Sequence, residues 1–153
     1  RFREYRLAAT KVETLPDLTA ALAEYAHNAE EIARTTAKMG AQIIFVSQPA
    51  LWRAGLGEAE SGALWLRGIG DFQEKPGALY YSATALAAGL DLYNRTLMET
   101  CAKVGAECLD LAPKIRRDLT LFYDDCHFNE AGARTVASEV ARFLSERPPF
   151  QKK

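Results

Sequence analysis

The segment "AQIIFVSQP", residues 41–49, gives the clearest indication of fold class in this sequence. Its apolar residues from Ile43 to Val46 follow one another without polar interruption, and Pro49 ends the run. Strands with one wet face alternate apolar and polar side chains, whereas strands of a parallel sheet are covered on both faces. The unbroken run therefore predicts a strand of a parallel sheet that is covered on both sides.

A long helix is predicted immediately before this strand, over residues 14–40. Thr14 and Asp17 form a capping-box pattern at its start, and Gly40 is a natural stop at its end. Mostly apolar side chains recur along it at steps of three and four, which predicts one face turned toward a core. These side chains are Leu18, Leu22, Tyr25, Ala29, Ile32, Thr36 and Met39.

Two further amphipathic helices are predicted in the second half of the chain. One spans about 83–104, with Ser82 as its N-cap and Gly105 as its stop. The other spans about 129–146 and begins at Asn129, a good N-cap residue. Between the two helices, "AECLDLAP" indicates a second short strand. This alternation of helices and strands is typical of the α/β class with a parallel sheet.

The predicted strands are too few for an independent domain. Two strands cannot bury three amphipathic helices, and residues 1–13 make a poor third strand. The chain also opens on Arg1 rather than on a methionine. We therefore expect it to be the later part of a larger α/β domain.

The connection over residues 50–81 lacks a sustained period and is rich in glycine. A connection this long inside a compact domain is usually functional or mobile. It also holds Trp65 and other aromatic residues, which indicates that part of it packs on the domain surface or on a ligand.

Composition argues against two classes of partner. The net charge of −1 over 153 residues provides no strong field for nucleic acid or for an anionic membrane. No apolar run approaches the length that spans a bilayer. The basic residues near the start are diluted by acids and are interpreted as a solvated face; they are Arg1, Arg3, Arg6 and Lys11.

The three cysteines form no CxxC pair, and their number is odd. This pattern disfavours both a disulfide framework and a structural zinc site. Cys101 and Cys108 fall within apolar patterns and are interpreted as core residues.

The segment "FYDDCHFNEAG", residues 122–132, concentrates groups that can carry out acid–base chemistry. A carboxylate three residues before an imidazole, across a turn, can reach the Nδ1 proton and orient the ring. The other ring nitrogen is then free to take a proton from a hydroxyl nucleophile. Asp124 is therefore the candidate orienting acid and His127 the candidate base, with Asp125 as the fallback for the acid.

Other interpretations of these residues stay open. An acid here can simply cap the turn while His127 lies on the surface, because short Asp-x-x-His matches are common by chance. The two acids, Cys126 and His127 are also possible metal ligands, although four adjacent residues rarely surround one ion. Cys126 is a weaker candidate nucleophile, since a residue adjacent to the histidine usually points away from it. His27 is interpreted as a helix-surface residue.

The stretch "FYDDCHFNEAGARTVASEVARFL", residues 122–144, resembles the last sequence block of the SGNH (GDSL-type) hydrolases. Asp124 and His127 fall on the two catalytic positions of that block, and Asn129 and Gly132 match the positions that follow. "GAQIIFVSQPALW" and "GAECLDLAP" are similar to the late strands of that fold. The resemblance implies a three-layer α/β/α fold with a parallel sheet, flavodoxin-like in outline. This chain would be the C-terminal part of one such domain.

The resemblance also implies serine-dependent hydrolysis of a carboxylic ester, of small-molecule, acylated-sugar or lipid type, without a metal or an organic cofactor. The family draws its serine from an early Gly-Asp-Ser block, but here Gly70 and Asp71 are followed by Phe72. Ser47 alone lies at a strand end near the expected site, and we interpret it as a strand-end hydroxyl because nothing around it supplies a sharp nucleophile turn. The serine is therefore expected in a missing N-terminal segment. The alternative is a non-catalytic α/β binding module or a degenerate hydrolase.

Overall fold

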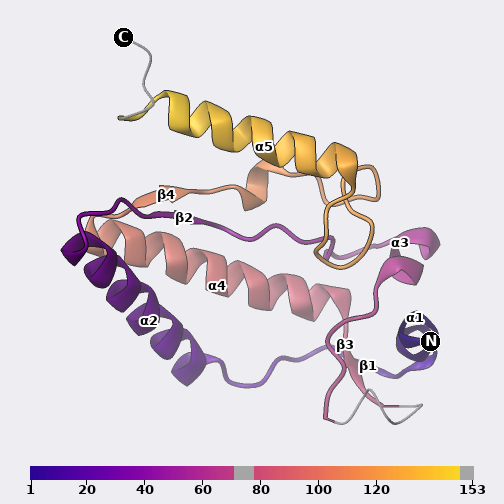
Figure 1. Ribbon diagram of the computed structural model, residues 1–153. Coiled ribbons are helices and arrows are strands. Elements are labelled where there is room, and N and C mark those ends of the chain that lie inside the picture. The colour runs from indigo at the N-terminus through magenta and orange to yellow at the C-terminus, as the bar shows by residue number, and fades with distance from the viewer. Residues whose placement is uncertain (71–77, 149–153) are drawn as a thin grey trace.

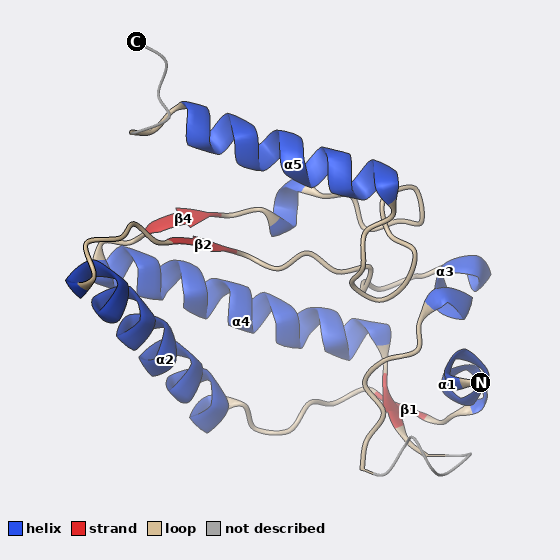
Figure 2. Cartoon of the chain, viewed as in Figure 1, coloured by secondary structure: helices blue, strands red, loops and turns tan. Residues whose placement is uncertain are grey.

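The computed structural model describes residues 1–70 and 78–148 (Figure 1). It is a mixed α/β structure in which helices predominate, as the cartoon in Figure 2 shows. The elements in chain order are α1 (Phe2–Ala8), β1 (Lys11–Val12), α2 (Thr19–Lys38), β2 (Ile44–Val46), α3 (Glu58–Ala63), β3 (Tyr80–Tyr81), α4 (Ala83–Val104), β4 (Glu107–Leu109), a short 3-10 helix (Ala112–Lys114) and α5 (Glu130–Ser145).

The two strands predicted from the sequence form a parallel pair. β2 and β4 are neighbours, with Phe45 opposite Cys108. The helix α4 lies in the chain between these two strands and leads into β4, as the long crossover between parallel strands requires. Figure 1 shows α5 on one side of this pair and α2 and α4 on the other. Phe45 packs toward α2 and α4, against Ala29 and Leu97.

The prediction that β2 is covered on both faces is wrong. Ile44 and Val46 remain 37% and 40% exposed. Successive side chains of a strand point to opposite faces. The face that carries Phe45 lies on two helices, whereas α5 leaves the face of Ile44 and Val46 partly open.

A second small parallel sheet joins the start of the chain to the end of the long connection. β1 pairs with β3, with Lys11 opposite Tyr80. The sequence analysis treated residues 1–13 as a poor strand and missed both α1 and α3. Residues 71–77, which hold the Asp and Phe of "GDF", lie outside the described residues. The two short pairs do not establish the single sheet of a three-layer arrangement.

The starts of α4 and α5 are where the sequence predicts them. Ser82 Oγ accepts the N–H of Ala85 at 3.0 Å at the start of α4. Gly105 ends that helix with a φ of +69°, a left-handed conformation that glycine adopts without strain. Asn129 is the N-cap of α5.

The start of α2 differs from the prediction. The helix begins at Thr19, and the expected capping box of Thr14 and Asp17 does not form. A residue before proline is disfavoured in the helical region, so Leu15 cannot extend the helix ahead of Pro16. Asp17 instead accepts the N–H of Thr19 at 2.9 Å.

The buried face of α2 is also narrower than the predicted stripe. Ala29 and Ala33 are buried, but Ile32 and Met39 are 51% and 78% exposed. Small side chains allow α2 to approach α4 closely, and Tyr25 meets Tyr93 of α4 edge-to-face with ring centroids 5.1 Å apart.

The main core brings together segments that are distant in sequence. It joins the connection after β2, the first half of α4, the segment after β4 and the last helix. Its buried members are Ala50, Leu51, Trp52, Ala63, Leu64, Leu86, Ala87, Leu109, Leu111, Ile115, Phe122 and Phe143. This packing places the segment that precedes α5 beside the connection that follows β2.

Cys101 and Cys108 are joined by a disulfide, with their Cα atoms 6.2 Å apart. The sequence analysis placed both in the core, and Cys101 is indeed buried. It did not favour a disulfide. The turn at Gly105 brings the end of α4 back alongside β4, so that the two sulfurs meet.

Candidate functional site

The loop of residues 119–129, here called the histidine loop, carries the two acids and His127. Its two sides are tied together by backbone contacts. Phe122 and Phe128 form an isolated antiparallel bridge. The N–H of Tyr123 donates to the carbonyl of His127 at 3.0 Å. The histidine is therefore held in a closed loop rather than on a free end.

Asn129 fixes this loop to the start of α5. Its Oδ1 accepts the N–H of Gly132 at 3.0 Å, and its Nδ2 donates to the carbonyl of Leu119 at 3.1 Å. Its own N–H donates to the carbonyl of Leu121 at 3.0 Å. A Cβ at Gly132 would lie 2.0 Å from that carbonyl oxygen, so only glycine fits. The helix start and the loop are thereby packed as one unit.

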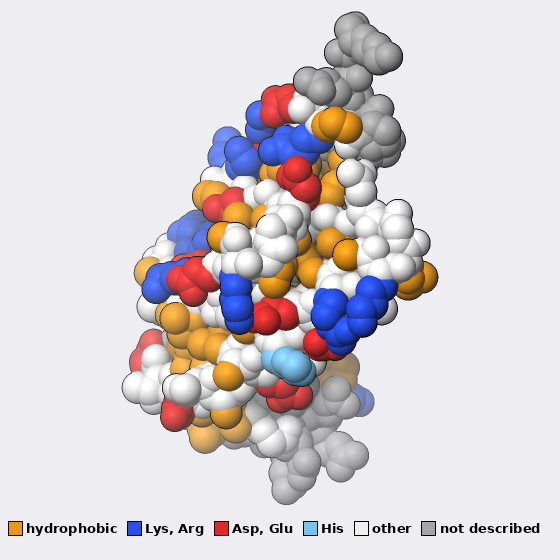
Figure 3. All heavy atoms as spheres, turned by 90° about the vertical axis from the view of Figure 1, so that its left-hand side faces the viewer, with side chains coloured by type: hydrophobic (Ala, Val, Ile, Leu, Met, Phe, Trp, Pro, Cys, Tyr) orange, Lys and Arg blue, Asp and Glu red, His pale blue; other side chains and the backbone are white. Residues whose placement is uncertain are grey.

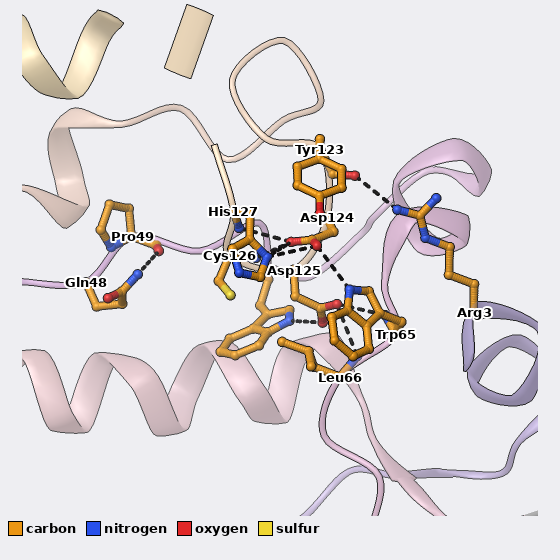
Figure 4. A network of polar contacts seen from close by, with 11 residues as sticks. Arg3, Gln48, Pro49, Trp65, Leu66, Tyr123, Asp124, Asp125, Cys126 and His127 are labelled. Atoms are coloured by element: carbon orange, nitrogen blue, oxygen red, sulfur yellow. Dashed lines mark hydrogen bonds and ion pairs between the residues drawn. The ribbon is translucent and has the colours of Figure 1, made fainter. Parts of the chain in front are cut away.

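Asp124 and His127 are in direct contact, as Figure 4 shows. His127 Nδ1 lies 2.9 Å from both carboxylate oxygens of Asp124. Asp124 also accepts the backbone N–H groups of Cys126 and His127, at 3.1 and 3.0 Å. The carboxylate therefore both caps the turn and orients the ring, which combines the two interpretations that the sequence left open.

Trp65 holds the far side of the same carboxylate. Its Nε1 donates to Asp124 Oδ2 at 3.0 Å. The aromatic content of the long connection predicts that part of it packs on a ligand or on the domain surface, but it does not indicate this contact of Trp65. Nothing in the local pattern around an isolated tryptophan predicts which acid it meets.

The electrostatics of Asp124 favour its charged form. Burial alone would raise its pKa, but hydrogen bonds from Trp65, from the backbone N–H groups of His127 and Cys126 and from the His127 ring outweigh burial. Together they lower the pKa of Asp124 to about 2. A carboxylate with four such donors stays ionised near neutral pH and can stabilise a positive imidazole.

The imidazole itself is accessible. The Asp124 side chain is fully buried, whereas the His127 side chain is 56% exposed. Within residues 1–70 and 78–148, the ring makes its hydrogen bonds through Nδ1 to Asp124. Nε2 is therefore open toward solvent or toward a reacting group.

Asp125 has a different role from the fallback that the sequence analysis gave it. Its Oδ1 accepts Trp52 Nε1 at 2.8 Å, and its Oδ2 accepts the N–H groups of Trp65 and Leu66 at 2.7 and 3.1 Å. Adjacent residues project in different directions, so Asp125 turns into the protein while Asp124 faces His127. The fallback is corrected: Asp125 ties the long connection to the histidine loop.

Arg6 supplies a buried positive charge near the contact between Asp125 and the long connection. It is only 2% exposed, and it donates to the carbonyls of Leu66 and Tyr81, both at 2.8 Å. Burial lowers the pKa of Arg6, and the negative charge of Asp125 opposes that shift. The interpretation of the first basic residues as a solvated face is therefore wrong for Arg6, because its carbonyl partners lie in segments distant in sequence.

Ser47 is not positioned as a nucleophile. It is fully buried, its hydroxyl donates to Asp110 at 2.6 Å, and it accepts the N–H of Ala112 at 2.9 Å. This agrees with the interpretation of Ser47 as a strand-end hydroxyl. The remaining serines lie on or cap helices; they are Ser61, Ser82, Ser138 and Ser145.

A metal ion has only a limited set of ligands here. One atom each of Asp124, Cys126 and His127 can lie within 4.8 Å of the others. The oxygens of Asp124 are already occupied by hydrogen bonds, and burial, followed by the charges of Asp124 and Asp125, raises the pKa of the Cys126 thiol. A neutral thiol is a poor metal ligand and a poor nucleophile. His27 is exposed on α2, as expected for a surface residue.

Comparison of the chain with known protein families, with curated protein sequences and with solved structures finds no match.

Among the helices of the described residues, none combines the length and apolar character needed to cross a membrane. On the face shown in Figure 3, basic and acidic side chains are interspersed. Functional inference therefore rests on the geometry of the histidine loop.

Proposed function

We propose that this chain provides the base and the orienting acid of a serine-dependent carboxylic-ester hydrolase of the SGNH type. The observation that supports this most directly is the contact between Asp124 and the Nδ1 side of His127, with Nε2 left open. The position of α5 on one side of the β2–β4 pair, with α2 and α4 on the other, is compatible with the later part of a three-layer α/β/α domain.

In this proposal, His127 Nε2 takes the proton of a serine hydroxyl while the serine oxygen bonds to the ester carbonyl carbon. Asp124 stabilises the imidazolium that results. The tetrahedral intermediate then breaks its bond to the alcohol oxygen, and Nε2 returns the proton to that alcohol. Water repeats the sequence on the acyl-serine and releases the acid.

The serine itself is proposed to come from a segment beyond this sequence. None of the chain's five serines is in contact with the His127 ring in the described structure. The isolated chain is therefore expected to hydrolyse p-nitrophenyl acetate no faster than its His127→Ala variant. Turnover by the isolated chain that a serine-reactive fluorophosphonate abolishes would refute the absence of the nucleophile.

The base is tested in the chain joined to the segment that is proposed to supply the serine. His127→Ala is expected to lower kcat for p-nitrophenyl esters by about 10³-fold or more, since the triad acts as a unit. His27→Ala provides the matched control because His27 is exposed on α2 and should leave kcat unchanged. Full activity in His127→Ala would overturn the proposed base.

One observation favours the second candidate, a non-catalytic binding module. Among the described residues, no serine hydroxyl contacts the His127 ring. A module of this kind would keep ester turnover at the level of buffer, in the wild type and in His127→Ala alike, even when the chain is joined to the segment proposed to supply the serine; the hydrolase proposal predicts turnover there that His127→Ala removes. It would also leave any ligand binding intact in that variant.

A further inference from the structure

A cavity of about 480 Å³ lies beside the site, between the start of α2, the first half of α4 and the connection that follows β2. Its volume falls in the range of small-molecule sites. Aromatic side chains form much of its wall, namely Tyr25, Trp52, Tyr81 and Tyr93. We call it the aromatic cavity.

A hydrogen bond connects the wall of the aromatic cavity to the histidine loop. Trp52, which forms part of its wall, donates its indole N–H to Asp125 at 2.8 Å. Asp125 directly follows Asp124 in the sequence. A molecule that occupies the cavity is therefore held by the same framework that orients His127.

Arg67 brings a positive charge to this cavity. Its guanidinium carbon lies 5.6 Å from the centre of the Trp52 ring. No carboxylate among the residues that the structure describes forms an ion pair with Arg67. Its charge also reaches the histidine loop, because it opposes the rise in the pKa of the Cys126 thiol.

The backbone of Arg67 is strained. Its φ is +69°, and it is the one non-glycine residue with a positive φ in the described part of the chain. That conformation is unfavourable for a residue with a Cβ, whereas glycine adopts it without strain. The neighbouring Leu66 N–H is held by Asp125, and the Arg67 carbonyl accepts the N–H of Tyr81 at 3.3 Å.

Glycine would thus adopt the backbone conformation at position 67 with less strain than arginine does. Strain of this kind clusters at ligand sites, where surrounding contacts fix a conformation that the residue would otherwise avoid. The backbone contact at position 67 would also form with glycine, so the contribution specific to arginine is its side chain. A cation above an aromatic wall that has no ion-pair partner among the described residues is suited to an anionic group attached to an apolar body.

We infer that the aromatic cavity binds the apolar part of a substrate that carries a carboxylate, with Arg67 as the counter-charge of that carboxylate. That the bound molecule is a substrate rests on the proposed hydrolase function, whereas the binding itself does not. The molecule belongs to the class of monocarboxylates with an aromatic or short aliphatic body.

The test is calorimetric titration of the chain with 4-phenylbutyrate and with its neutral analogue 4-phenylbutyramide. The carboxylate is expected to bind about fivefold tighter, the upper range for one partly exposed ion pair. Arg67→Gly should remove that preference and leave the amide affinity within twofold. Arg67→Lys keeps the charge and should retain part of the preference.

Two controls separate folding and catalysis from binding. Arg67→Gly is expected to unfold at the same temperature as the wild type or higher, because it relieves the strain. Leu18→Trp, on the cavity wall, should weaken both ligands together. His127→Ala should change neither affinity, so failure of the hydrolase proposal leaves this test readable. Equal affinities for the two ligands, a preference that survives Arg67→Gly, or binding of neither ligand would overturn the inference.

Discussion

Asp124 and Asp125 are neighbours in sequence and both are fully buried, yet they contact different parts of the molecule. Asp124 faces the His127 ring and receives the indole N–H of Trp65. Asp125 faces inward and binds the long connection through Trp52 and two backbone N–H groups. Burial alone therefore does not identify a functional acid; what each carboxylate contacts does.

Removal of Asp125 is expected to have the largest effect on stability. Asp125→Ala leaves one buried and two part-buried donors without an acceptor, and it removes the negative charge that opposes the effect of burial on Arg6. We expect the free energy of unfolding, measured with urea, to fall by about 4 kcal/mol. Asp91→Ala, at an exposed acid, should change it by less than about 0.5 kcal/mol. Similar losses in both variants would contradict the framework role of Asp125.

Substitution at Gly132 tests the other anchor of the histidine loop. A methyl group there would lie 2.0 Å from the Leu121 carbonyl oxygen, so the loop and α5 must move apart in Gly132→Ala. We expect a loss of about 3 kcal/mol in urea unfolding. Gly62→Ala on α3 meets nothing within 4 Å and should be neutral or slightly stabilising. A neutral Gly132→Ala would show that this close packing is not required.

The pH dependence of stability should report the ionisation of Asp124, with a smaller effect than these two substitutions. The pKa of Asp124 is lowered to about 2 in the fold from an ordinary value of 3.8. Its stabilising contribution is complete above pH 4 and is lost as the pH falls toward 2, by on the order of 2 kcal/mol. Thermal unfolding of Asp124→Asn should show a flatter profile in that window. An unchanged profile would mean that these hydrogen bonds do not stabilise the ionised form of Asp124.

The sequence was sufficient where local signals determine the structure. Ser82 and Asn129 mark helix starts through their own side chains, and β2 and β4 follow from compact apolar runs. The spacing of Asp124 and His127 likewise predicts their contact, because a turn brings residues three apart together.

Long-range partners were not predictable in the same way. Trp65 meets Asp124 across 59 residues and Trp52 meets Asp125 across 73. Arg6 joins the junction from the first helix, where the local pattern indicated a solvated face. These contacts depend on how distant segments pack, which local periodicity and capping patterns do not specify.

The state of the His127 ring provides the most direct test of the central claim. Long-range ¹H–¹⁵N NMR of the chain at pH 8 should show the proton on Nδ1 and an unprotonated Nε2, because Asp124 accepts from Nδ1. The Asp124→Asn variant should lose this preference. A proton on Nε2 in the wild type, or spectra of His127 that do not change in Asp124→Asn, would contradict the account.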